Sequence, residues 1–211
     1  MLKNNKKQLF VYRDVRRGFM QHNKGRFCFT KYCICALIYR WKDFDTDAYS
    51  GKKKKFAEFL GIKPPAVTYH LNKLIEMGEV VETESGLKLV AQSAWDAIGK
   101  QKIKGSFVIL DFKIKIKLAS KRYSRPLSIE QFAVLSILVT LNMRKERNLW
   151  IKDLPILLKL DRDTVKTAIN KLVKYGILNQ YREFDSAYLN EFFKNYIQQI
   201  KDNAHVYYGE Y

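Results

Sequence analysis

Three cysteines and three histidines are the side chains best suited to metal binding or nucleophilic catalysis. Cys28, Cys33 and Cys35 lie close together in the sequence. Together with His22 they could form a zinc site, but their spacings match no familiar one, and buried cysteines on a core helix are far more common. His70 falls near the edge of an apolar helical stripe, where packing is commoner than catalysis. With no glycine-rich phosphate loop and no nucleophile motif, the sequence predicts no enzyme, no cofactor and no metal site.

Basic side chains are the more informative feature. The 211 residues include 39 Lys and Arg against 21 Asp and Glu, a net charge of +18. Both halves are basic, with net charges of +11 for residues 1–105 and +7 for residues 106–211. Such a field attracts polyanions, and its spread over the whole chain favours nucleic acid over an anionic membrane. A basic protein with no polyanion partner is the alternative.

Membrane and export features are absent from the sequence. No apolar run approaches the ~20 residues that a membrane span needs. The first residues, MLKNNKK, lack the apolar core of a signal peptide. An odd number of cysteines offers no disulfide framework and fits a reducing compartment. We therefore expect a cytoplasmic, nucleoid-associated protein with no membrane contact.

Four consecutive lysines enter a predicted short helix; they are Lys52, Lys53, Lys54 and Lys55. Cations at a helix start oppose the helix dipole, which favours a partner anion such as phosphate, although a solvated helix start is the alternative. Lys88, in a predicted hairpin, is a further phosphate or minor-groove candidate. Glu82 and Glu84 make that hairpin less cationic.

Two segments, 65–77 and 162–175, are predicted to form helices with one apolar and one polar side. In the first segment, Val67, Leu71 and Leu74 lie at i, i+4 and i+7, which places them on one buried stripe. The second segment repeats this pattern 98 residues later. The opposite side of each helix is polar and is predicted to face solvent or a ligand.

Both segments belong to an internal repeat. Sliding the sequence by 98 residues aligns the apolar positions from residue 30 to residue 80 without a gap. Eight residues are identical to the residue 98 positions later: Leu37, Lys54, Leu60, Val67, Asn72, Lys73, Leu74 and Gly78. The alignment also pairs Thr30 with Ser128 as helix N-caps, and Gly78 with Gly176 as C-terminal cap glycines. Chance alignment of two small helical domains is the alternative.

Each half is predicted to contain a strand, three helices and a hairpin. In the first half these elements cover residues 9–12, 31–42, 53–60, 65–77 and 79–90. In the second half they cover residues 107–110 with an alternating strand at 112–118, then 129–143, 152–158 and 162–175. The second hairpin lacks a turn glycine, and a last helix is expected over 186–202.

Residues 61–82, GIKPPAVTYHLNKLIEMGEVVE, resemble the turn, recognition helix and wing of bacterial winged helix-turn-helix regulators such as the MarR and ArsR families. Residues 161–178, DRDTVKTAINKLVKYGIL, resemble the same element and those of phage and plasmid replication proteins. The resemblance covers about 60 residues in each half. It implies a mainly α fold with small β (α+β), built as two tandem winged helix-turn-helix units over residues 1–103 and 104–211.

The same resemblance implies which side chains face DNA. In the first unit they are Lys63, Thr68, Tyr69, Asn72 and Lys73. In the second they are Arg162, Thr164, Lys166, Thr167, Asn170, Lys171 and Lys174. Asn bonds adenine, Tyr or a Thr methyl contacts thymine, and Arg at a helix start reads guanine. A solvated helix face is the alternative for each residue.

These features lead us to expect sequence-specific binding of double-stranded DNA by a transcriptional repressor of bacterial, plasmid or phage origin, reading two half-sites. A plasmid or phage replication initiator, or a DNA-transfer accessory protein that binds an origin, is an alternative. A protein-interaction scaffold is a second alternative. A homodimer through the last helix is a further expectation.

Overall fold

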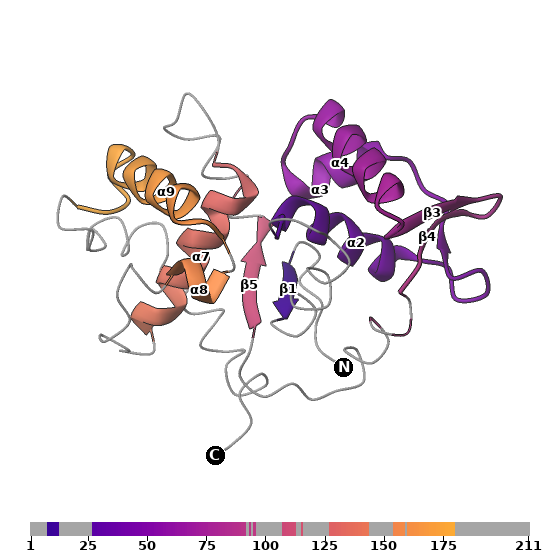
Figure 1. The fold of residues 1–211 in the computed structure, drawn as a ribbon, viewed down its shortest axis with the longest axis horizontal. Coiled ribbons are helices and arrows are strands. Elements are labelled where there is room, and N and C mark those ends of the chain that lie inside the picture. Colours follow the sequence, from indigo (N-terminus) through magenta and orange to yellow (C-terminus); the bar gives the residue numbers. More distant parts are fainter. Residues whose placement is uncertain are drawn as a thin grey trace, which may run out of the picture. The chain divides into compact units, whose positions relative to one another are not determined.

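The chain combines helices with a small antiparallel sheet, as the α+β prediction requires (Figure 1). The computed structural model describes residues 8–12, 27–91, 93, 95, 107–112, 115, 127–143, 154–158 and 160–179. The Cα positions divide the chain into two compact units. The first comprises residues 1–103 with 111–113, and the second comprises residues 104–110 with 114–211.

Helix α2 (Phe29–Trp41) is the central helix of the first unit, and strand β1 (Gln8–Tyr12) packs against it. Residues 32–38 are all buried, so the helix is enclosed on nearly every side. Cys33 and Cys35 lie within this buried stretch, and Cys28 is half-buried just before it. The interpretation of Cys33 and Cys35 as core residues of a helix is therefore confirmed.

The start of α2 corrects one prediction. Cys28 occupies the N-cap position, and Thr30 is buried inside the first turn. Thr30 is therefore not an N-cap. The helix begins earlier because Phe27 and Phe29 both pack into the core, with their rings edge to face at 4.8 Å.

A tight turn joins helix α3 (Lys54–Leu60) to helix α4 (Pro64–Glu76). Gly61 follows α3 in the left-handed conformation, with φ 58° and ψ 46°, which suits glycine because it has no Cβ. The amide of Ile62 then donates to the carbonyl of Ala57 at 3.2 Å. The last turn of α3 is thereby closed, and the chain is free to start α4 in a new direction.

Helix α4 is amphipathic, as predicted. It buries Val67, Leu71 and Leu74 against the rest of the unit. It begins at Pro64, one residue earlier than expected, because a proline in the first turn loses no intrahelical hydrogen bond. The helix ends at Glu76, and Gly78 follows two residues later with a φ of 71°, which confirms the predicted cap glycine.

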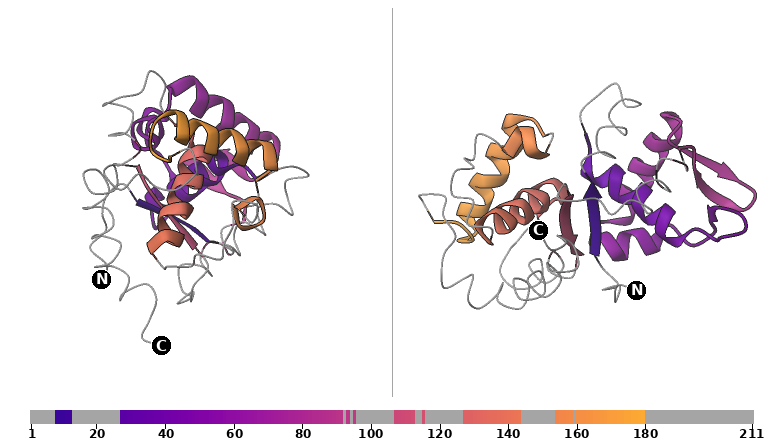
Figure 2. Two further views of the ribbon diagram at one scale, coloured as in Figure 1. Left: turned by 90° about the vertical axis from the view of Figure 1, so that its left-hand side faces the viewer. Right: turned by 90° about the horizontal axis from the view of Figure 1, so that it is seen from below.

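The hairpin after α4 is formed by β3 (Val80–Thr83) and β4 (Gly86–Leu89), with Val80 opposite Leu89. It projects away from the three helices of this unit (Figures 1 and 2). A third strand, β2 (Ala48–Tyr49), pairs antiparallel with β4. The elements predicted from the sequence include no strand between residues 42 and 53; Ala48 and Tyr49 are nevertheless buried, because they complete the sheet next to α2.

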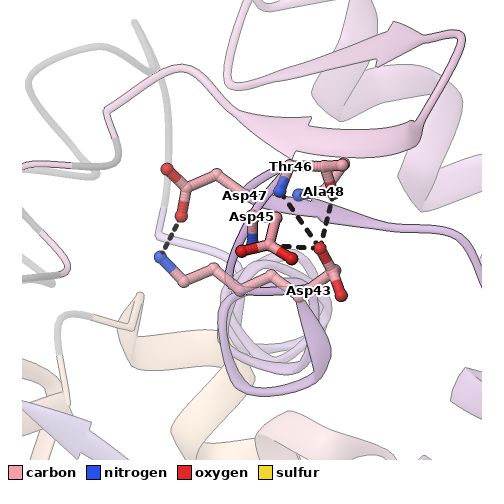
Figure 3. A network of polar contacts seen from close by, with 6 residues as sticks. Asp43, Asp45, Thr46, Asp47 and Ala48 are labelled. Atoms are coloured by element: carbon pink, nitrogen blue, oxygen red, sulfur yellow. Dashed lines mark hydrogen bonds and ion pairs between the residues drawn. The ribbon is translucent and has the colours of Figure 1, made fainter.

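A hydrogen-bonded loop connects α2 to β2 (Figure 3). Oδ1 of Asp43 accepts from the amides of Asp45 and Thr46 at 3.0 and 3.1 Å, and from the Thr46 hydroxyl at 3.3 Å. These backbone hydrogen bonds lower the pKa of the Asp43 carboxyl. Lys42 closes the loop through an ion pair with Asp47 at 2.6 Å. Phe44 lies within this loop and is 94% exposed.

An aromatic cluster joins the end of α2 to β2 and α3. The ring of Trp41 lies 5.8 Å from that of Tyr49, 5.6 Å from Phe56 and 5.4 Å from Phe59. Tyr49 and Phe56 meet edge to face at 4.9 Å. Phe56 is completely buried, so the cluster anchors the short helix α3 to the core.

The second unit contains β5 (Phe107–Asp111), α7 (Ile129–Met143), α8 (Leu154–Leu158) and α9 (Arg162–Lys174). Ser128 is the predicted N-cap of α7, since its Oγ accepts from the Gln131 amide at 3.2 Å and its own amide donates to Gln131 Oε1 at 3.0 Å. Asp161 caps α9 by accepting from the Thr164 amide at 2.8 Å.

One strand prediction in the second half of the sequence is wrong at positions 112 and 115; the other residues of 112–118 lie outside the part of the chain that the structure describes. The alternating pattern over 112–118 predicted a strand with a cationic face, but β5 ends at Asp111, and Phe112 and Lys115 are helical. Both side chains are buried, at 0% and 2% exposure. Residues three apart share one face of a helix, so the burial of Phe112 and Lys115 fits helical spacing. The alternation of apolar residues in the sequence suggests a period of two instead.

The same backbone hydrogen bonds recur 98 residues apart. Ile62 N to Ala57 O and Leu160 N to Pro155 O are both 3.2 Å. Four further pairs of hydrogen bonds share this offset. Their donors are the amides of Val67 and Val165, Met77 and Tyr175, Gly78 and Gly176, and Glu79 and Ile177. Gly176 has a φ of 68°, close to that of Gly78. Helices α4 and α9 therefore begin, run and end in the same register.

The first helices follow a different offset. Tyr32 N donates to Cys28 O, and the equivalent bond in the second unit runs from Phe132 N to Ser128 O, 100 residues later. The N-caps of the two helices, Cys28 and Ser128, are therefore 100 residues apart, whereas the alignment without a gap paired Thr30 with Ser128. Counted from these N-caps, the second unit has two residues fewer before the turn that precedes α9. The predicted second hairpin and last helix lie outside the described residues, apart from the bridge residue Leu178.

Candidate nucleic-acid interface

The outer side of α4 forms the first candidate surface, which we call the α4 face. It consists of Lys63, Thr68, Tyr69 and Asn72, all of which are exposed. Tyr69 is a large ring that is 59% exposed, with its edge packed against His70 at 5.2 Å. The hydroxyl of Thr68 donates to the Pro64 carbonyl at 3.4 Å. This face presents an aromatic ring, an amide and a methyl group, which suit contact with base edges.

Lys73 borders the α4 face but is engaged by an acid. Its Nζ lies 2.5 Å from Oε2 of Glu76, one turn along the helix. This hydrogen bond, together with the charge of Glu76, raises the pKa of Lys73. The pair neutralises the C-terminal half of the helix surface. Glu76 therefore competes with any phosphate for the Lys73 ammonium.

The four lysines at the start of α3 are all exposed but differ in their neighbours. Lys53 pairs with Glu82 of β3 at 3.3 Å, and Lys54 pairs with Glu58 at 3.4 Å. The ammonium of Lys55 lies 4.5 Å from the ring centre of Trp41. Exposed pairs of this kind contribute about 0–1 kcal/mol, so a phosphate can replace either carboxylate at small cost.

The outer side of α9 forms the second candidate surface, which we call the α9 face. It consists of Arg162, Lys166, Thr167, Asn170 and Lys174, all exposed. Among the residues that the structure describes, no carboxylate forms an ion pair with Arg162, Lys166 or Lys174. The stripe on the other side of the helix is buried, including Val165 and Leu172. The α9 face is therefore cationic as well as exposed.

Two residues predicted to face DNA from α9 have structural partners. Thr164 is half-buried, and its hydroxyl donates to Oδ2 of Asp161 at 2.6 Å. The Nζ of Lys171 donates to Oε1 of Gln131 at 2.9 Å and lies 5.6 Å from the ring centre of Tyr175. Lys171 thus reaches back to the first turn of α7. Both side chains therefore stabilise the position of α9 through contacts within the protein itself.

None of the predicted contact residues is buried. Thirteen are exposed, and the half-buried ones are Lys73, Lys88, Thr164 and Lys171. Sequence reasoning missed the acids that engage the lysines. The spacing of Lys54 and Glu58 at i, i+4 could have revealed that pair. The pair of Lys53 and Glu82 depends on the tertiary fold, which brings β3 close to the start of α3.

Comparison with protein-family models, curated proteins and solved structures finds no match to this chain. In the described part of the chain, no three His, Cys, Asp or Glu side chains gather closely enough to hold a metal ion. His22, the fourth residue of the imagined zinc set, lies outside that part. Among the same residues, no helix has both the length and the apolar character that a membrane crossing demands.

Proposed function

We propose that the chain binds double-stranded DNA through the α4 and α9 faces, each carried by the recognition helix of a winged helix-turn-helix unit. The observation that carries this proposal is that both helices bury one stripe and expose the opposite, polar side in the same register, 98 residues apart. A helix exposed in this way has the dimensions to enter the major groove with its outer side chains against base edges.

The order of elements supports the winged-helix assignment for the first unit. Three helices, α2, α3 and α4, are followed by the β3–β4 hairpin, and β2 completes the sheet. In the second unit α7, α8 and α9 repeat the three-helix order. The recurrence of five backbone hydrogen bonds at one offset supports a tandem duplication.

The charge supplies affinity for phosphate. With a net charge of +18 the chain attracts duplexes at long range. If about eight phosphates are neutralised, the logarithm of the binding constant falls with a slope of about −7 against the logarithm of salt concentration. We propose that the chain uses this sequence-specific binding as a transcriptional regulator of the repressor type.

The test is selection of bound sequences from a random 30-base-pair duplex pool, followed by fluorescence anisotropy on the selected duplex and on its scrambled version. At ~150 mM salt we expect the selected duplex to bind at least ~10³-fold more tightly than the scrambled one. The variant Asn72→Ala should lose ~1–3 kcal/mol of binding free energy for the base contact that it removes. Phe44→Ala, a surface change outside both faces, serves as the control.

Two results would overturn the proposal. The absence of duplex binding even at ~50 mM salt would remove DNA as the partner and leave a protein scaffold. Equal affinity for all sequences would remove sequence-specific regulation. If the selected sequence lies in the direct repeats of a replication origin and not in a promoter, the chain is a replication initiator and not a transcriptional regulator.

A further inference from the structure

The two recognition helices differ in charge although they share a register. Helix α4, PPAVTYHLNKLIE, carries one lysine and one glutamate, which pair with each other. Helix α9, RDTVKTAINKLVK, carries four cations and one aspartate. Equivalent positions show the contrast: Thr68 corresponds to Lys166, and Glu76 corresponds to Lys174. The difference is concentrated on the exposed sides, since the buried stripes remain alike.

The start of α4 also lacks backbone donors for a phosphate. Pro64 and Pro65 have no amide hydrogen. The next two amides, of Ala66 and Val67, both donate to the carbonyl of Lys63, at 3.0 and 3.4 Å. A helix N-terminus normally binds anions through such amides, so α4 has lost this mode of contact.

Apart from Lys63 at the N-cap and the Lys73–Glu76 pair, the groups that α4 exposes are uncharged. Tyr69 offers a ring that is 59% exposed, and Asn72 offers an amide that can pair with adenine. Because the Thr68 hydroxyl donates its proton to the Pro64 carbonyl, the side chain offers a base its methyl group and an oxygen that can only accept. Ring and methyl contacts favour the methyl group of thymine. These contacts release no counterions, so they add no salt dependence.

We propose that the two helices divide the work of recognition: α4 reads an A·T-rich half-site through uncharged contacts, and α9 supplies salt-dependent phosphate contacts. This inference rests on the proposed function and adds to it a composition for one half-site and an energetic role for each helix. Arg162, Lys166 and Lys174 are the phosphate-binding side chains of α9. Tyr69 and Asn72 are the specificity-determining side chains of α4.

Reciprocal exchange at equivalent positions tests the division in the full chain. The measurement is the affinity for the selected duplex and for a scrambled duplex between ~50 and ~200 mM salt. Lys166→Thr should reduce the magnitude of the salt slope by about 0.9, which narrows the ratio of Kd between these two salt concentrations about 3.5-fold. It should weaken both duplexes equally. Thr68→Lys should add a similar amount if the α4 face approaches a phosphate.

The second pair of variants tests the reading of bases. Asn72→Ala should weaken the selected duplex by about 5–150-fold while leaving the scrambled duplex and the salt slope unchanged. Asn170→Ala, the matched change on α9, should alter the ratio between the two duplexes much less. The selected sequence should contain an A·T-rich half-site. When the A·T pairs of this half-site are replaced by G·C, Asn72→Ala should no longer lower the affinity for the duplex.

The outcomes separate this inference from the function on which it rests. If the unmodified chain binds no duplex at ~50 mM salt, both fail together. If it binds specifically but Lys166→Thr leaves the salt slope unchanged, or if Asn72→Ala and Asn170→Ala lose equal discrimination, the division of labour is wrong and DNA binding stands. Circular dichroism of each variant checks that these exposed substitutions leave the helices folded.

Discussion

The Nζ of Lys171 donates a hydrogen bond to Oε1 of Gln131 at 2.9 Å, and this contact ties the outer helix α9 to the first turn of α7. The same oxygen accepts from the amide of Ser128 at 3.0 Å, so one side chain caps a helix and anchors its neighbour. The first unit has Lys31 at the corresponding place, with its Nζ 3.2 Å from the sulfur of Met77. The starts of α2 and α7 thus use different chemistry to hold α4 and α9.

Replacing Gln131 tests this anchor. Gln131→Ala removes the acceptor of both bonds and should lower the free energy of unfolding by about 1–2 kcal/mol, from the lost cap and the lost lysine contact. Gln131→Glu keeps both acceptors and should be neutral or stabilising. Urea unfolding, with amide hydrogen exchange of residues 127–137, measures the change. Equal stability of the alanine and glutamate variants would contradict the anchor.

Two glycines with positive φ should respond very differently to alanine. A Cβ on Gly86, with φ +124°, would lie 2.3 Å from the carbonyl oxygen of Tyr49, whereas a Cβ on Gly78, with φ +71°, meets nothing within 4 Å. Gly78→Ala therefore costs only the backbone strain, about 1–2 kcal/mol. Gly86→Ala adds a clash that separates β2 from β4 and should cost clearly more, on the order of 3 kcal/mol or above. Thermal unfolding monitored by tryptophan fluorescence compares them.

Two phenylalanines provide a matched pair for the core of the first unit. Phe56 is 0% exposed within the aromatic cluster, and Phe44 is 94% exposed. Phe56→Ala should lower the free energy of unfolding by about 3–5 kcal/mol, because it leaves a cavity beside Trp41. Phe44→Ala should change it by no more than about 0.5 kcal/mol. Similar losses for the two variants, measured in urea, would show that the cluster is not the core of this unit.

The thiol of Cys35 makes the stability depend on pH in the alkaline range. Burial raises the pKa of Cys35 well above its usual 9.0, and the negative charge of Glu79 raises it further. The folded chain keeps this proton at a pH where the unfolded chain has released it. The stabilising contribution is therefore complete below pH 9.0 and is lost as pH rises from there towards the folded pKa.

The measurement is urea unfolding between pH 7 and pH 10.5. The unmodified chain should lose up to about 1.4 kcal/mol per pH unit above pH 9 from this thiol, and Cys35→Ala should lose less over the same range. In the folded chain, iodoacetamide should alkylate Cys28 before Cys35, since Cys28 is half-buried and Cys35 is buried. Equal alkylation rates at neutral pH would contradict the burial of Cys35.

Several parts of the structure follow from short stretches of sequence. The stripe of Val67, Leu71 and Leu74 repeats at helical spacing, so the buried side of α4 was visible before any coordinates. Asp161 as an N-cap and Gly176 as a cap glycine were equally predictable, because capping depends on bonds within three or four residues. The exposure of the predicted contact residues follows from the same periodicity.

The errors in these predictions have separate causes. Ala48 and Tyr49 form a strand only because β4, about 40 residues later, offers its edge. Phe112 and Lys115 are helical and buried where local alternation suggested a strand. The N-cap of α2 lies two residues before the predicted Thr30, because buried aromatic rings extend the start of the helix.

The sequence alone determined the amphipathic character of α4 and α9, their common register and their ends, because periodicity and capping are set by neighbouring residues. Tertiary structure decided which cations are engaged. Lys53 meets Glu82 and Lys171 meets Gln131 through folding that brings residues 29 and 40 positions apart into contact. The availability of charge on α4 and α9 is therefore a property of the folded chain, since an ion pair or a hydrogen bond depends on distance in space.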